Sequence, residues 1–316
     1  MNPAEIAAAF DLGRPVGPLE PVQTSEFQTW RVTTTAGRFL IKQLGGAAVT
    51  ELDQAMQLER RAIAAGILTP KPIAPRKPAV GWAAKVPDLI RVYEWVDHRT
   101  LTPQDDVSEW FGRTLSTLHG LLAMEDGFVP EWRWLGVYPR ARWESWIASA
   151  AGKPWASLLG RRLDHLTGFT ERVRRAHAYR HVLSHRDVGP WNVHVADDYL
   201  LIDWEGAGPV LPGCETGRSI RYLGRDDFQT MVRLRDAYLG SGGRISCAPE
   251  DFLLDSLTDL LAQITERIRL TVGDYPDPEV PLWMDPPTAD ERITSDLERF
   301  PVEEQRLSEL GVRLLS

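Results

Sequence analysis

Residues 184–192 read SHRDVGPWN, and the aspartate of a second segment, residues 202–205 (IDWE), stands eleven positions after Asn192. The pattern combines a carboxylate at Asp187, an amide at Asn192 and a second carboxylate at Asp203. Phosphoryl transfer needs this set: one carboxylate accepts the proton of an acceptor hydroxyl, while an amide and another carboxylate hold Mg²⁺ against the phosphates. Hard oxygen ligands suit that ion. The two segments therefore predict a phosphoryl-transfer site.

The same region predicts a β-hairpin. Residues 192–195 and 200–203 are strand-like, and residues 196–199 (ADDY) are typical of a turn. A hairpin brings Asn192 and Asp203 to the same end. Because a single Asp or Asn in a loop is usually a turn or capping residue, the interpretation depends on the combination.

Residues 185–192 (HRDVGPWN) and 201–208 (LIDWEGAG) resemble the catalytic and metal-binding signature of the aminoglycoside phosphotransferase family of small-molecule kinases. The resemblance extends from about residue 27 to the C-terminus and implies a bilobal, protein-kinase-like α+β fold. It implies that Asp187 is the general base and that Asn192 and Asp203 bind Mg²⁺. It also implies that the γ-phosphate of ATP or GTP passes to a hydroxyl of a small molecule.

The N-terminal part of the chain has the pattern of a small antiparallel sheet with one helix. Residues 30–35 and 38–42 are strand-like, residues 50–65 have helical periodicity, and further strands are expected at 80–86 and 89–96.

Lys42 and Glu59 are expected to position the nucleotide in this part. A kinase needs a strand lysine on the phosphates and a helix glutamate paired with it, and Lys42 ends the strand-like run FLIK. Glu59 lies on the apolar stripe of its helix, where a carboxylate needs a partner, and Lys42 is the natural one. A solvated lysine and a glutamate that reaches solvent are the alternatives.

Residues 89–96 (LIRVYEWV) predict the strand and linker between the lobes. Their backbone is expected to bind the nucleotide base, which makes Tyr93, Glu94, Trp95 and Val96 nucleotide-binding candidates. A bulky Tyr93 beside the base leaves ATP and GTP both open, and simple packing of these aromatic side chains is equally compatible with the sequence.

Residues 23–29 (QTSEFQT) stand where a kinase has its Gly-rich loop, yet they contain no glycine. Amides of a Ser/Thr turn can still contact phosphate oxygens, so Ser25 is a candidate for nucleotide binding. A plain hairpin turn is the simpler explanation.

The chain after Asp203 argues against a protein substrate. Pro209 and Pro212 follow closely, and a helix is expected near Glu215, which leaves no segment for peptide docking. A non-catalytic nucleotide-binding pseudokinase is a further alternative, against which the retained catalytic-type residues speak.

The sequence places the lobe boundary between residues 1–97 and 98–316. The second part is mainly helical, and we expect His119 and His185 to be structural histidines. Helices are expected at 104–123, 140–151, 157–179, 215–239, 249–272 and 302–315.

The acceptor site is expected in the C-terminal lobe, where aromatic and acidic residues gather. The aromatic candidates are Trp132, Trp134, Trp143 and Trp146, and the acidic ones are Glu215, Asp226, Asp227, Asp251, Asp255 and Asp259. Packing of the tryptophans and a solvated acidic face are the plainer explanations. An aminoglycoside or other antibiotic, a sugar, an amino alcohol and homoserine all stay open as acceptors, and so do antibiotic resistance, self-protection and metabolism as roles.

Composition excludes several classes of partner. A net charge of −8 over 316 residues disfavours nonspecific binding to nucleic acid or an anionic membrane. No secretion signal or membrane-length apolar run is found, and the two cysteines, Cys214 and Cys247, form no disulfide framework, so we expect a cytoplasmic protein. Nothing in the sequence indicates the oligomeric state.

Overall fold

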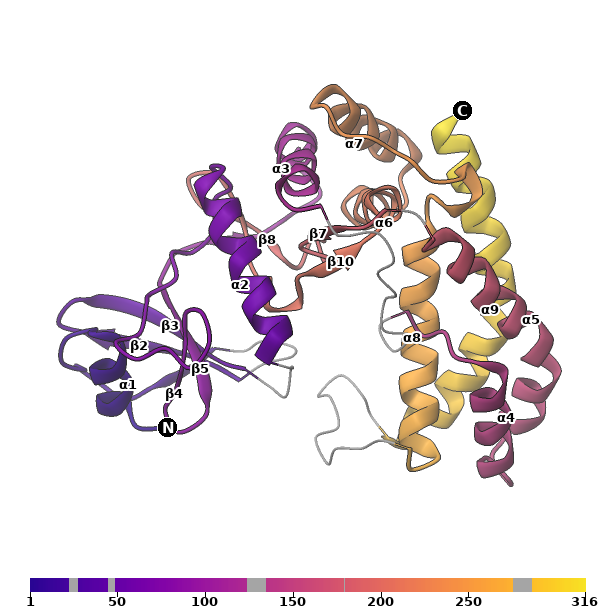
Figure 1. Ribbon diagram of the computed structural model, residues 1–316, viewed down its shortest axis with the longest axis horizontal. Helices are drawn as coiled ribbons and strands as arrows, with labels where there is room; N and C mark the ends of the chain where they lie inside the picture. The colour runs from indigo at the N-terminus through magenta and orange to yellow at the C-terminus, as the bar shows by residue number, and fades with distance from the viewer. Residues whose placement is uncertain (23–27, 45–48, 124–134, 179, 275–285) are drawn as a thin grey trace. The chain divides into compact units, whose positions relative to one another are not determined.

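A computed structural model describes residues 1–316 except 23–27, 45–48, 124–134, 179 and 275–285 (Figure 1). The chain divides into two compact units: Met1–Trp110 with Leu183–Gly208, and Phe111–Val182 with Pro209–Ser316. The first unit extends beyond the predicted lobe of residues 1–97, because it also contains residues 98–110 and residues 183–208.

The first unit contains an antiparallel sheet with strand order β1-β2-β3-β5-β4. Its strands are β1 (Glu20–Val22), β2 (Thr29–Thr34), β3 (Gly37–Gln43), β4 (Ala83–Lys85) and β5 (Leu89–Glu94). In the register of β3 and β5, Lys42 lies opposite Arg91. Residues directly opposite each other share a face of the sheet, so these two cations project to the same side.

Two helices accompany this sheet. Helix α1 (Pro3–Phe10) begins where Asn2 caps it, with the Asn2 Oδ1 accepting from the Ala4 amide at 2.9 Å. Helix α2 (Val49–Ala64) confirms the predicted helix, and Gly66 follows it with a φ of 87°. Leu52 and Met56 of α2 pack with Leu44, Val80 and Ala83 in one apolar cluster. This packing fixes the face of α2 that also carries Glu59.

The predicted hairpin forms a second small sheet in the first unit. It contains β6 (Arg99–Thr100), β8 (Val193–Val195) and β9 (Tyr199–Leu201), in the order β6-β8-β9. Val193 pairs with Leu201, and the Ile202 amide donates to the Asn192 carbonyl at 3.0 Å. Asn192 and Asp203 therefore lie at the same end of the hairpin, as predicted.

Short elements flank this hairpin. The 3-10 helix η1 (Trp204–Gly206) follows Asp203, while β7 (Val182–Ser184) and β10 (Gly208–Val210) stand where the chain passes from one unit to the other. The Leu201 amide donates to the Leu68 carbonyl at 3.0 Å, which ties the hairpin to the chain that follows α2.

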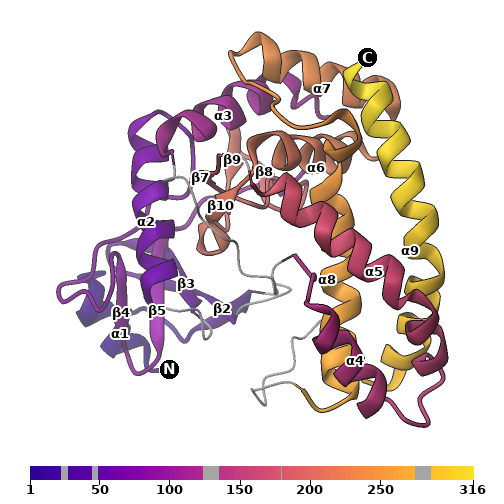
Figure 2. The same cartoon turned by 45° about the vertical axis from the view of Figure 1, so that its right-hand side comes forward.

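The second unit is mainly helical, and α8 runs along α9 within it (Figure 2). Ile264 and Ile268 of α8 and Ile293 and Leu297 of α9 are all buried. The elements are α3 (Ser108–Leu121), whose first turn belongs to the first unit, α4 (Arg140–Ser149), α5 (Ala156–Ala176), α6 (Pro212–Gly224), α7 (Phe228–Gly240), η2 (Pro249–Asp251), α8 (Leu254–Thr271) and α9 (Pro286–Leu315).

The α+β prediction is confirmed, but some of the predicted helices need correction. The helix expected over 215–239 is two helices, because Arg225 and Asp226 adopt left-handed backbone angles, φ 52° and 58°, and end α6. Asp227 then caps α7 by accepting from the Thr230 amide at 2.9 Å.

The second correction concerns α9. It continues through Pro301 and begins at Pro286, well before the predicted start at residue 302. Within the part of the chain that the structure describes, no helix combines the length and the apolar character needed to cross a bilayer.

Candidate active site

Asp187 sits in a tight loop after β7 in the first unit. Arg186 adopts a left-handed φ of 68°, and the Gly189 amide donates to the Asp187 carbonyl at 3.0 Å. The buried His185 ring donates through Nε2 to the Ile202 carbonyl at 2.9 Å. His185 therefore links the loop to the hairpin by this hydrogen bond, as expected for a structural histidine.

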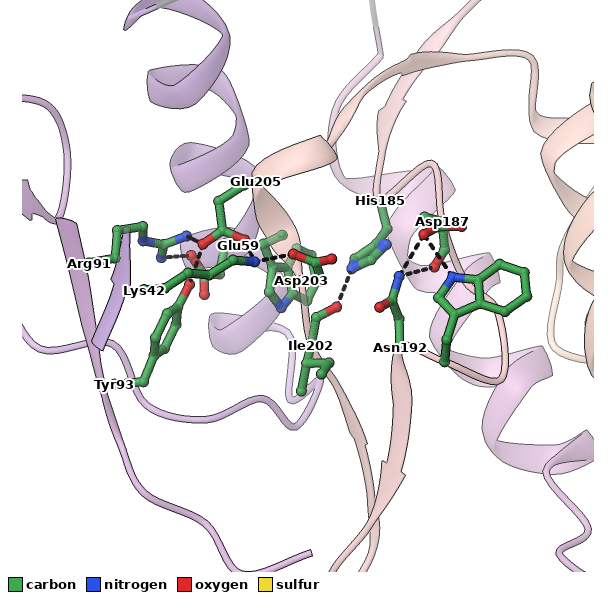
Figure 3. Close-up of polar contacts among 12 residues, drawn as sticks. Lys42, Glu59, Arg91, Tyr93, His185, Asp187, Asn192, Ile202, Asp203 and Glu205 are labelled. Carbon is green, nitrogen blue, oxygen red and sulfur yellow. Dashed lines mark hydrogen bonds and ion pairs between the residues drawn. The ribbon is translucent and has the colours of Figure 1, made fainter. Parts of the chain in front are cut away.

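Asn192 contacts the catalytic candidate directly. Its Nδ2 donates to the Asp187 carbonyl at 2.9 Å and to Asp187 Oδ2 at 2.7 Å (Figure 3). The amide nitrogen is thereby engaged, so Oδ1 is the atom of Asn192 that suits a cation. Asp187 is also bonded by Trp191, whose Nε1 donates to Oδ2 at 2.8 Å.

Asp203 occupies a strained backbone position between β9 and η1. Its φ and ψ are 70° and 55°, in the left-handed region that non-glycine residues rarely adopt. Such outliers persist only where the surroundings impose them, and they cluster at functional sites. The Asp203 carboxylate forms an ion pair with Lys42.

The predicted pair of Lys42 with Glu59 is wrong. Lys42 instead contacts Asp203, and its Nζ lies 2.7 Å from Glu205 Oε2. The ion pair of Glu59 is with Arg91, whose Nη1 also lies 3.0 Å from Glu205 Oε1. The need of Glu59 for a partner was predicted correctly, but its partner is the other cation on the same sheet face.

The chemistry of the arginine side chain explains why Glu59 pairs with Arg91 and not with Lys42. Arg91 offers five N–H donors in a planar fork, so one guanidinium can bond two carboxylates on different elements. Tyr93 adds its hydroxyl, which donates to Glu205 Oε1 at 3.1 Å. Glu205 is thus held by Lys42, Arg91 and Tyr93 at once (Figure 3). The sequence analysis did not identify Arg91 or Glu205 as members of this cluster. For Arg91 a signal was available, because an arginine stands within a strand whose other residues are typical of a buried one.

Burial controls the charges in this cluster. Desolvation raises the pKa of Glu59 to about 7 against the opposing field of Arg91, and one of its oxygens, Oε1, is buried without a hydrogen-bond partner. Burial would also raise the pKa of Glu205, but Lys42 and Arg91 outweigh it and hold that pKa below its ordinary range. Burial opposes the charge of Lys42 as well, yet Glu205 and Asp203 raise its pKa overall. Lys42 and Glu205 therefore stay charged near neutral pH.

The linker residues show contacts within the chain. The Tyr93 side chain is buried, with the Arg91 guanidinium 4.7 Å from the centre of its ring. The amides of Glu94 and Trp95 donate to the carbonyls of Lys71 and Arg38, at 2.9 and 3.0 Å. Because these two amides are already bonded within the chain, a backbone contact of Glu94 or Trp95 with the nucleotide base would have to use the carbonyl oxygen.

Side chains of the linker add further contacts. Glu94 pairs with Lys71 at 2.8 Å, and the Trp95 indole donates to Asp97 at 2.8 Å. The Val96 carbonyl accepts from the His98 ring at 2.8 Å. Ser25, the candidate for phosphate contact, lies outside the described residues.

In the second unit, several of the described acceptor-site candidates are engaged in packing or ion pairs. Trp143 and Trp146 are buried in the core, so packing is the correct interpretation for both. Asp251 belongs to η2 rather than α8, so Asp251, Asp255 and Asp259 do not share the one helix expected over residues 249–272. Asp251 pairs with Arg172 at 2.7 Å. Trp132 and Trp134 lie outside the described residues.

Two further candidates in the second unit, Glu215 and Asp259, also have partners there. Glu215 lies 2.7 Å from His119 Nε2, and His119 Nδ1 lies 2.8 Å from the Tyr238 hydroxyl, so His119 is the structural histidine expected. Asp259 pairs with Arg218 and accepts from the Tyr222 hydroxyl at 3.1 Å.

Comparison with known proteins finds one matching family model, described as the phosphotransferase enzyme family, over residues 19–249. No curated protein matches the chain significantly.

Solved structures share the fold at low sequence identity. A choline/ethanolamine kinase family protein from Mesorhizobium loti matches with a TM-score of 0.61 and 16% identity, covering 98% of this chain and 97% of that one. A spectinomycin phosphotransferase with bound ADP and spectinomycin gives 0.60 and 12%, covering 95% and 96%. A microcompartment-associated aminopropanol kinase gives 0.58 and 19%, covering 98% of both chains. These likenesses show that the chain shares its fold with these three proteins.

Proposed function

The chain belongs to the phosphotransferase enzyme family, and from that premise we propose that it transfers the γ-phosphate of ATP or GTP to a hydroxyl of a small molecule. One observation carries the proposal. Lys42 contacts Asp203, the residue before Asp203 is bonded to Asn192, and Asn192 is bonded to Asp187. The residues proposed as phosphate-binding cation, metal ligands and base thus follow one another within one unit (Figure 3).

Asp187 is the proposed general base. Its carboxylate accepts the proton of the acceptor hydroxyl as the oxygen attacks the γ-phosphate. The two donors on Oδ2, from Asn192 and Trp191, orient the carboxylate before the acceptor arrives. Orientation of this kind lowers the barrier because it is established before the reaction.

Asn192 and Asp203 are the proposed Mg²⁺ ligands. Their side chains fit the ion, because the Asn192 amide nitrogen is already bonded to Asp187 and its Oδ1 is a hard oxygen, as are those of the Asp203 carboxylate. When bound, Mg²⁺ neutralises charge on the phosphates. The strained backbone at Asp203 supports the assignment, since it aims that carboxylate at a cost.

Lys42 is the proposed contact to the nucleotide phosphates. Asp203 and Glu205 both pair with it, so Glu205 can keep Lys42 in place when Asp203 engages the metal. Glu205 is in turn fixed by Arg91. Glu59 contributes through Arg91 rather than by touching Lys42.

The acceptor is proposed as a small hydroxylated molecule: an aminoglycoside or other antibiotic or, in a metabolic role, a sugar, an amino alcohol or homoserine. The names of the structural neighbours span both roles, with kinases of spectinomycin and amicoumacin on one side and of ethanolamine and aminopropanol on the other. The short connection from Asp203 to α6 supports a small acceptor over a peptide.

A panel screen by mass spectrometry tests the proposal. The protein is incubated with Mg²⁺ and ATP or GTP and with aminoglycosides, spectinomycin, ethanolamine, 1-amino-2-propanol, homoserine and sugars. We expect one class to gain the mass of a phosphoryl group, and we expect Asp187→Asn to abolish the gain. The control is Asp197→Asn, the same change at an exposed hairpin residue. Nucleotide binding without transfer to any member would favour the pseudokinase instead.

A further inference from the structure

Trp191 is a half-exposed aromatic residue inside the catalytic loop. Its exposed fraction is 47%, and among the large hydrophobic side chains that the structure places at the surface it is the only aromatic one. Single exposed apolar residues are common and need no explanation by themselves. This one differs because both the nitrogen and the ring of its indole are held.

The indole nitrogen is tied to the proposed base. Trp191 Nε1 donates to Asp187 Oδ2 at 2.8 Å, and Asn192 Nδ2 donates to the same oxygen at 2.7 Å. Two donors that converge on one carboxylate oxygen restrict rotation of the carboxylate. Hydrogen bonds to a charged group are also stronger than bonds between neutral groups.

The indole ring is held by Gly189. A Cβ at position 189 would lie 2.6 Å from Cζ2 and 2.7 Å from Cε2 of Trp191, closer than real Cβ contacts. The glycine backbone therefore packs directly against the ring. Trp191 is fixed by packing along the ring and by a bond at its nitrogen, while nearly half of its surface stays open to solvent.

We propose that Trp191 positions the Asp187 carboxylate and that its exposed ring forms the surface on which the acceptor molecule rests during transfer. The inference depends on the proposed role of Asp187. An acceptor hydroxyl must come within hydrogen-bond distance of the base, and the indole nitrogen is only 2.8 Å from that base. The carbon frame that carries the hydroxyl must then pass close to the indole. A rigid aromatic face offers contact area at low entropic cost.

Two substitutions separate the two parts of the proposal. Trp191→Phe removes the N–H and keeps an aromatic ring, whereas Trp191→Ala removes both. The matched control is Trp155→Phe, which removes an equivalent indole bond to a carboxylate, Trp155 Nε1 to Asp290 at 2.8 Å, in the other unit. Thermal unfolding establishes that each variant is folded.

Kinetics with water as the acceptor test the positioning role. In Mg²⁺-dependent ATP hydrolysis under single-turnover conditions, Trp191→Phe should lower the rate about tenfold, the loss expected for one hydrogen bond to a charged group. The half-saturating ATP concentration should stay the same, because Trp191 contacts the base and not the nucleotide. Trp155→Phe should change neither. A wild-type rate in Trp191→Phe would overturn the positioning role.

Acceptor kinetics test whether the Trp191 ring contacts the acceptor. The acceptor used is whichever of spectinomycin, ethanolamine and 1-amino-2-propanol is phosphorylated. Trp191→Ala should raise the KM for that acceptor well above the value for Trp191→Phe. Equal KM values in the wild type and in Trp191→Ala would overturn the contact surface.

Two comparisons keep the test informative. If Asp187→Asn hydrolyses ATP as fast as the wild type, the proposed function fails; if Asp187→Asn is inactive while Trp191→Phe is normal, only this inference fails. The indole N–H resonance of Trp191, identified by its loss in Trp191→Phe, should also shift in Asp187→Asn. A resonance that does not move would show that the bond is absent, whatever the activity.

Discussion

Replacing Arg91 by methionine removes the cation that two buried carboxylates share. Arg91 is 1% exposed and contacts both Glu59 and Glu205. Methionine fills much of the same volume without charge. In the variant Glu205 keeps Lys42 and Tyr93 as partners, whereas Glu59 loses its cation.

The expected loss follows from what each carboxylate can do. Removing one partner of a buried ion pair costs about 3–5 kcal/mol in free energy of unfolding. Glu59 can limit its share by taking up a proton, because its pKa is already about 7. Glu205 remains paired with Lys42. We therefore expect Arg91→Met to cost about 3 kcal/mol at pH 7, the lower end of the range.

The penalty should grow with pH. Above pH 7 the wild-type Glu59 is ionised in both the folded and the unfolded protein, so it does not make the free energy of unfolding depend on pH. In Arg91→Met the folded state holds Glu59 protonated while the unfolded state releases the proton. Stability then falls by about 1.4 kcal/mol per pH unit. The double variant Glu59→Gln, Arg91→Met should lack this slope.

Urea denaturation at pH 7 and pH 8.5, followed by circular dichroism, measures both effects. Arg140→Met, which removes half-exposed ion pairs to Glu144 and Asp164, is the control and should cost less than about 1 kcal/mol. A loss in Arg91→Met as small as in that control, or a loss that is the same at the two pH values, would show that Glu59 does not depend on the Arg91 charge.

Three further predictions concern the same site. Glu59 binds its proton more tightly when folded, with a pKa of about 7 against 4.5, so its stabilising contribution is complete below pH 4.5 and is lost as the pH rises to 7. Relative to Glu59→Gln, the wild type should lose about 3 kcal/mol in free energy of unfolding between pH 4.5 and pH 7, as measured by urea midpoints at the two pH values. The same change with pH in both proteins would contradict this. Glu205→Gln should raise the KM for ATP about tenfold, because Lys42 loses a charged partner, and an unchanged KM would exclude that role. Gly189→Ala should displace the Trp191 ring and lower turnover to the level of Trp191→Ala, and full activity would show that the ring can move at no cost.

Local sequence patterns predicted much of the fold and of the loop that carries Asp187. Helix α2 and the hairpin from β8 to β9 depend on neighbours in the chain, and both are present. Asp187 and Asn192 are five positions apart, so their contact is also local.

The partners of the buried charges could not be predicted in the same way. Whether Lys42 or Arg91 meets Glu59 depends on the register of β3 against β5 and on the placement of η1, which are contacts between distant parts of the chain. The break between α6 and α7 was missed for another reason. Arg225 and Asp226 adopt left-handed angles without glycine, so the sequence carries only a weak signal there.

Turnover of Asp187→Asn, measured beside its affinity for Mg²⁺ and ATP, shows whether Asp187 is the general base. If Asp187 is the base, phosphoryl transfer to the acceptor found in the panel should fall by about 10²–10⁴-fold, while ATP affinity stays close to the wild-type value. Transfer at the wild-type rate would contradict the account.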